Sequence, residues 1–142
     1  MWWLIYAFLS SITAALVAIF ARLGLKGIDS TLATTVRSII MAGFLLVVSF
    51  FLKKFHGFSW RSFSSKDWVL IILAGISGAL SWLFYFFALK TAGSATKVVV
   101  IDRLSLVFFI ILAAIFLGEK LGWNSVVGAL LMIVGALIIT LK

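Results

Sequence analysis

Apolar residues run through the 142-residue chain in five long stretches, separated by short segments that hold most of the charged residues. Each stretch is about as long as the ~20 helical residues that cross a ~30 Å hydrocarbon core. None alternates between apolar and polar positions, as a strand of a membrane barrel would. The sequence therefore predicts an all-α polytopic membrane protein with one transmembrane domain over residues 1–142. Its five helices are expected at about residues 3–23, 31–52, 68–89, 98–118 and 123–141.

Polar residues at the ends of these stretches indicate where the helices begin. Asp29 or Ser30 can cap the second helix, and Ser64 with Asp67 forms a capping-box pattern before the third. The first stretch has no Lys or Arg before it and no cleavage site after it, which predicts a permanent helix. The chain contains no proline. Any break in a helix must therefore come from glycine or from polar side chains.

Composition excludes several classes of protein. Hydrophobic residues make up 65% of the chain and charged residues 11%, whereas about a quarter of the residues of a soluble protein are charged. The chain has no cysteine, and its one histidine, His56, has no neighbouring group of metal ligands. Gly93–Lys97 lacks the glycine that precedes the lysine of a phosphate-binding loop. We therefore expect no enzyme, no metal, no cofactor and no soluble domain.

An odd number of spans places the two termini on opposite faces of the membrane, and the connector cations divide evenly between those faces. The N-terminal face would carry Lys53, Lys54, Arg61, Lys66 and Lys120, and the other face Arg22, Lys26, Lys90, Lys97 and Lys142. Because the Lys/Arg difference between short loops sets orientation, this balance predicts insertion in both orientations. The alternative is that the cluster over residues 53–66 fixes a single orientation.

The net charge of +8 is spread over connectors on both faces. Basic residues beside membrane spans are typical of proteins that contact anionic lipid, so the expected partner is membrane lipid and not nucleic acid. The second connector also carries aromatic residues among its cations, which predicts that it lies in the headgroup layer. These residues are Phe55, Phe58, Trp60 and Phe63.

Three charged residues lie well inside predicted spans, where each costs free energy unless it is paired or hydrated. Arg37, Asp102 and Arg103 fall at similar depths, roughly 6 to 9 Å below one face at 1.5 Å per helical residue. The arginines can extend toward the headgroups, whereas the short Asp102 side chain cannot. Asp102 is therefore expected to pair with Arg37 or Arg103. Such a cluster is either a closed salt bridge between helices or a site for substrate or protons, and a surplus guanidinium would favour a carboxylate-bearing solute.

Other polar and aromatic residues could line the same cavity. Ser11 brings a hydroxyl to the middle of the first helix, and Trp82 and Tyr85 form part of an aromatic stripe on the third. Hydroxyl groups in membrane helices also bond neighbouring helices, and aromatic rings also pack, so a purely structural role stays open for each of them.

The fourth span ends Phe116-Leu117-Gly118-Glu119-Lys120-Leu121 and is followed by a last helix with Gly128 and Gly135. With Ile101-Asp102-Arg103-Leu104-Ser105, this pattern resembles the EamA domain of the drug/metabolite transporter superfamily in its half-size bacterial and archaeal form. The resemblance covers all five spans and implies a carrier or exporter of small metabolites in the cytoplasmic membrane, with Glu119 in a structural role. Full-length members often have a proline near the position of Leu106, so a proline-dependent kink is not expected here. They also often have Ser or Thr at the position of Gly122.

These observations predict a secondary transporter of a small metabolite that works as an antiparallel homodimer, in which two five-helix chains form an inverted repeat. Two alternatives remain. The chain could pair with an inverted paralogue, or it could be a membrane scaffold whose Arg37 and Asp102 only hold helices together.

Overall fold

The computed structural model describes residues 2–24, 27–56, 59 and 63–141, and all the regular elements among them are helices. Five segments are long and apolar enough to span a membrane, as the sequence predicts. Some of the cations and aromatic residues predicted for the connectors and the C-terminus lie outside the described residues. They are Lys26, Phe58, Trp60, Arg61 and Lys142. The protein is thus an all-helical polytopic membrane protein.

The helices group into two compact units. One contains residues 23–90, with helices α2 (Ser30–Phe51) and α3 (Ser65–Thr91). The other contains residues 1–22 and 91–142, with α1 (Trp2–Gly24), α4 (Ala95–Asp102), α5 (Ser105–Phe116) and α6 (Trp123–Thr140).

Two carboxylate caps fix the helix starts in the α2–α3 unit. Asp29 Oδ1 accepts hydrogen bonds from the N–H groups of Thr31 at 2.9 Å and Leu32 at 3.1 Å, which identifies Asp29 as the cap of α2. Ser64 and Asp67 form the predicted capping box, with Ser64 N–H to Asp67 Oδ2 at 3.0 Å and Asp67 N–H to Ser64 Oγ at 3.2 Å. Ser64 directly precedes α3 and Asp67 lies in its first turn, so the box lets the helix begin at Ser65, earlier than the expected start near residue 68.

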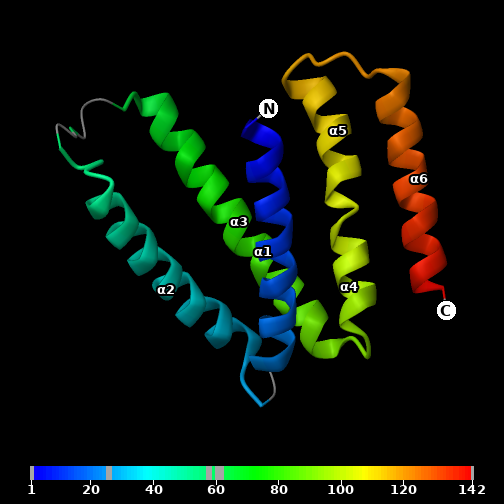
Figure 1. The fold of residues 1–142 in the computed structure, drawn as a ribbon, viewed down its shortest axis with the longest axis horizontal. Coiled ribbons are helices and arrows are strands. Elements are labelled where there is room, and N and C mark those ends of the chain that lie inside the picture. The colour runs from blue at the N-terminus through cyan, green and yellow to red at the C-terminus, as the bar shows by residue number, and fades with distance from the viewer. Residues whose placement is uncertain (1, 25–26, 57–58, 60–62, 142) are drawn as a thin grey trace. The chain divides into compact units, whose positions relative to one another are not determined.

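In the other unit α6 runs alongside both α4 and α5 (Figure 1). Lys97 Nζ donates a hydrogen bond of 2.9 Å to the carbonyl oxygen of Thr140, the last residue of α6. A cation at a helix C-terminus is stabilised by the helix dipole and by the carbonyls that have no intrahelical partner. Lys97 therefore links α4 to the end of α6, whereas the sequence indicated only a connector cation.

The fourth span differs from its prediction as one helix over residues 98–118. It starts at Ala95 and divides into α4 and α5, which are separated by Arg103 and Leu104 (Figure 1). The break occurs without proline or glycine, next to Asp102, Arg103 and Ser105. The break therefore does not depend on proline, and polar side chains stand at the interruption.

Candidate functional site

Arg37 lies on α2 of the first unit, seven residues after the first residue of the helix, Ser30. At 1.5 Å per residue this is about 10 Å along the helix, slightly deeper than expected. Its guanidinium carbon lies 3.6 Å from the centroid of the Trp82 ring and 5.5 Å from that of Phe86. These distances are within the range of a cation–π interaction, which is worth up to ~2 kcal/mol where water is excluded. The guanidinium is thus stabilised within the span by the rings of α3.

The rings on α3 form a compact cluster. Trp82 and Tyr85 meet edge to face, with centroids 5.7 Å apart, and Phe86 lies 5.8 Å from Trp82 and 6.1 Å from Tyr85. Edge-to-face pairs at such distances are favourable because the positive edge of one ring meets the negative face of another. Phe86 is buried, and Arg37, Trp82 and Tyr85 are half-buried. The structure therefore brings three of the predicted site residues together.

Phe86 is the member of this cluster that sequence reasoning did not include. It lies four residues after Trp82, the spacing at which two side chains share one face of a helix. That spacing alone could have identified it as a neighbour of Trp82. It could not have shown that both rings contact Arg37.

Arg37 also borders a hollow on α2 of about 410 Å³, lined otherwise by the apolar residues Ile28, Leu32, Ala33, Val36 and Ile40. The cation is therefore the polar feature of an apolar concavity. A few polar groups that orient a ligand in an apolar hollow are typical of small-molecule sites.

Asp102 lies at the end of α4 in the second unit, half-buried, and seven residues after Ala95. Its depth along its own helix is therefore also about 10 Å. Arg103 follows directly and is exposed. Whether Asp102 pairs with either arginine stays a prediction, and a pair with Arg37 would join residues of different units.

The backbone around Asp102 departs from α-helical bonding. The N–H of Leu104 donates to Ile101 C=O at 3.0 Å and the N–H of Leu106 donates to Arg103 C=O at 3.1 Å, so both bonds step back three residues instead of four. The carbonyl oxygens of Val100 and Asp102 thereby lose the donors that a continuous α-helix would supply. Exposed backbone groups are not tolerated in lipid, and irregular backbone within a span occurs where it is covered by protein or lines a water-filled cavity.

Ser11 is placed on α1, where its hydroxyl donates a hydrogen bond of 2.8 Å to Phe8 C=O. The hydroxyl is thus satisfied by its own helix, although its oxygen can still accept a bond. Its role as a ligand group stays a prediction.

The groups needed to hold a metal are not clustered in the described part of the chain, where no three His, Cys, Asp or Glu residues come together. A charged guanidinium and an ionisable carboxylate inside spans are instead the features that commonly mark substrate or ion pathways in membrane proteins.

Comparison with known proteins gives the family. The model of the EamA-like transporter family matches residues 1–141. A Sinorhizobium protein named "Uncharacterized transporter in cobO 3'region" is 35% identical over 140 residues, which is 96% of this chain and 95% of that protein. No solved structure matches the chain. These similarities point to a transporter and not to an enzyme. The chain belongs to the EamA-like transporter family and is a multi-pass membrane transporter.

Proposed function

We propose that the protein is a secondary transporter of small carboxylate-bearing metabolites across the cytoplasmic membrane, and that Arg37 binds the carboxylate. The observation that carries this proposal is the guanidinium carbon of Arg37 at 3.6 Å from the Trp82 ring. A ring can cover one face of a guanidinium, but the five N–H donors point outward in its plane. Those donors need an acceptor inside the membrane, and a carboxylate fits them bidentately.

The rings beside Arg37 add an apolar component to the site. Trp82, Tyr85 and Phe86 would contact the hydrocarbon part of a solute whose carboxylate is bound to Arg37. A small metabolite with one anionic end and one flat or apolar end fits this combination. Arg103 and Ser11 remain candidates for further contacts with it.

We assign proton coupling to Asp102. A half-buried carboxylate beside carbonyl groups freed by a helix break has reason to be hydrated. A carboxyl group in such a place can take up a proton on one side of the membrane and release it on the other. Transport would then draw on the proton gradient.

The antiparallel homodimer supplies the second half of the inverted repeat. Five spans with evenly divided connector cations support insertion in both orientations. The two opening states of such a dimer are equivalent by symmetry, so a small difference in binding free energy would shift the population between them. Pairing with an inverted paralogue would give the same architecture. It differs from the homodimer in that this chain would then insert in a single orientation.

The test of the substrate site is uptake of radiolabelled carboxylates by proteoliposomes that contain the purified protein. We expect Arg37→Gln to lower uptake by about ten- to a hundredfold, because a hydrogen bond to a charged group is worth ~1.5–3 kcal/mol. Arg37→Lys should keep part of the activity, more than Arg37→Gln and less than the wild-type protein, since lysine keeps the charge but lacks the planar fork. The matched control is Lys120→Gln, which removes a cation outside the helices. Equal loss in the control, or full activity in Arg37→Gln, would contradict the assignment.

Orientation is tested separately in intact cells. A reporter fused after residue 142 and a matched reporter in the connector over residues 53–66 should each report from both faces of the membrane. A single orientation would exclude the self-antiparallel dimer and favour the paralogue. The scaffold alternative is supported by the fact that Arg37 already joins α2 to α3, and it would be favoured if no carboxylate were transported.

A further inference from the structure

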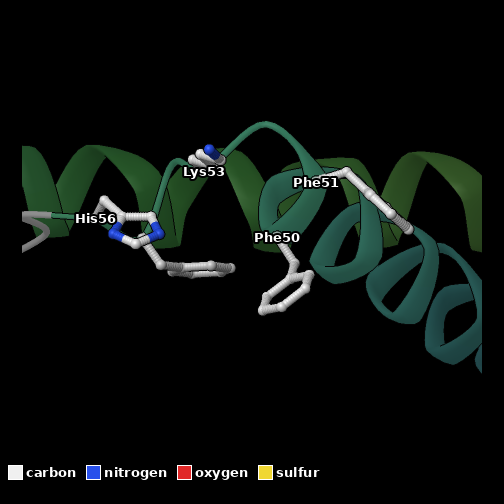
Figure 2. Close-up of a pocket in the computed structure, with 5 residues that line it drawn as sticks. Phe50, Phe51, Lys53 and His56 are labelled. Carbon is white, nitrogen blue, oxygen red and sulfur yellow. The ribbon is translucent and has the colours of Figure 1, made fainter.

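A second hollow lies at the end of α2 that is farther from Arg37. It has a volume of about 330 Å³ and is lined by Phe50, Phe51, Lys53, Phe55 and His56 (Figure 2). Phe50 and Phe51 are the last two residues of the α2 span, and Lys53 and His56 follow it. The hollow therefore extends from the hydrocarbon edge of the span into the headgroup layer.

The helix end that forms this hollow is a Schellman motif. The N–H of Lys54 donates to Ser49 C=O at 3.0 Å, and the N–H of Lys53 donates to Phe50 C=O at 3.0 Å. The N–H of His56 then donates to Lys53 C=O at 3.2 Å, which closes a further turn. Two successive tight turns thus follow the helix end, and the side chains of Phe50, Lys53 and His56 line the hollow (Figure 2).

Lys53 occupies the left-handed position of this motif, with φ of 53°. Glycine is the usual residue there because a Cβ costs roughly 1 kcal/mol in the left-handed region. At the end of α5 the chain does use glycine, and Gly118 has φ of 66°. Among the described residues Lys53 is the one non-glycine residue with positive φ. A side chain kept at a strained position is a reason to look for a role for that side chain.

We infer that this hollow binds the phosphate of an anionic phospholipid, with the Lys53 ammonium and a ring N–H of His56 as donors and the phenylalanine rings against the upper acyl chain. Phe50 and Phe51 are the last two residues of the span, and Lys53 and His56 follow it, the same order as acyl chain and phosphate in a lipid. Lys54 and Lys66 in the same connector add positive potential, which attracts anionic headgroups.

The C-terminal end of the α2 dipole is negative and attracts a cation, so it balances part of the Lys53 charge. The dipole would stabilise any lysine near this helix end, including Lys54. The left-handed backbone and the position in the hollow distinguish Lys53 from Lys54. The two residues therefore form a matched pair for an experiment.

The experiment measures lipid adducts of the full-length detergent-purified protein by native mass spectrometry, with phosphatidylglycerol or phosphatidylcholine added. We expect phosphatidylglycerol to be retained over phosphatidylcholine, and Lys53→Asn to weaken its retention by about five-fold, as for loss of one interfacial cation. Asparagine tolerates the left-handed backbone, so the helix end is preserved. Lys54→Asn removes the same charge outside the hollow and should have a smaller effect. His56→Phe should also weaken retention, because it removes the ring N–H.

Three outcomes would overturn the inference. The first is equal retention of the two lipids, and the second is an equal effect of Lys53→Asn and Lys54→Asn on retention. The third is displacement of phosphatidylglycerol by inorganic phosphate at equal concentration, which would indicate a site for free anions. Thermal unfolding of each variant in detergent checks that the fold is unchanged. If Lys53→Asn lowers the unfolding temperature, Lys53→Gly provides the same charge loss with a relaxed backbone, and its lipid retention decides the result.

Discussion

The two charged sites within the spans differ in how the surrounding chain accommodates them. Arg37 lies on an uninterrupted helix, and rings from α3 cover its guanidinium at 3.6 and 5.5 Å. Asp102 lies where the helix itself stops, with α5 beginning three residues later at Ser105. One charge is accommodated by side chains and the other by a change in the backbone.

The chemistry of the two groups explains the difference. A guanidinium is weakly hydrated and is attracted to the negative faces of aromatic rings, so it can remain charged among apolar side chains. Rings offer a carboxylate no comparable contact at their faces, and a short side chain cannot reach the headgroups. A carboxylate therefore needs N–H groups or water, and backbone carbonyls freed within a span occur where water or protein covers them.

The largest expected effect is on proton-driven transport and comes from changing Asp102. Asp102→Asn keeps the size and polarity of the side chain but removes its ability to carry a proton. We expect the variant to fold, and its proton-driven transport, measured in proteoliposomes under an imposed pH gradient, to fall by about a hundredfold or more. Gradient-free exchange of substrate should persist. Loss of assembly with no specific loss of pH dependence would instead favour the scaffold role.

The next effect concerns the rings over Arg37. Trp82→Leu keeps an apolar side chain but removes the ring face, and we expect the free energy of unfolding to fall by about 1–2 kcal/mol. Unfolding in mixed detergent and SDS micelles measures this change. Phe84→Leu is the matched control, since Phe84 lies on the same helix and is 70% exposed. A double-mutant cycle with Arg37→Met should show coupling for Trp82, and additive effects would contradict the proposed stacking.

A smaller effect is expected in the unit that contains the broken span. Lys97→Met removes the hydrogen bond to Thr140 C=O but keeps the length of the side chain. We expect a loss of about 1 kcal/mol in the same unfolding measurement. Hydrogen exchange at the end of α6 should increase at the same time. Unchanged exchange there would show that α6 does not depend on this bond.

The smallest effect compares the starts of α2 and α4. Asp29 caps α2 with its side chain, whereas Ser94 at the start of α4 makes no side-chain cap bond. The backbone hydrogen bond from Leu32 is the main cause that lowers the pKa of Asp29 below its ordinary value of 3.8. The lowered pKa stabilises the folded state above pH 3.8, and this contribution is lost as the pH falls through the lowered pKa.

Hydrogen exchange of the first turn of α2, compared between pH 6 and pH 3, measures the loss of this cap after correction for the intrinsic exchange rate. We expect faster opening at the lower pH for α2 and no such change for the first turn of α4. Asp29→Ser keeps a capping oxygen that does not titrate and should remove the difference. A difference that persists in Asp29→Ser would have another origin.

The number of spans and most of their ends could be predicted because they depend on local properties. The length and hydropathy of a span are properties of one continuous segment, and the caps at Asp29 and Ser64 involve only a few neighbouring residues. The break after Asp102 was not predicted, because the chain has neither proline nor glycine there and its polar residues are compatible with an unbroken helix. The bond from Lys97 to Thr140 was missed because it joins residues 43 positions apart.

The sequence by itself determined that this is a five-span helical membrane protein, since burial in lipid depends on hydropathy and helical rise. It predicted that Arg37 and Asp102 lie at comparable depth. It also contains the motifs that resemble the EamA domain. Only the tertiary structure decided which groups contact Arg37 and how the fourth span accommodates Asp102. Contacts between helices depend on rotation and backbone bonding, and no linear spacing specifies either of them.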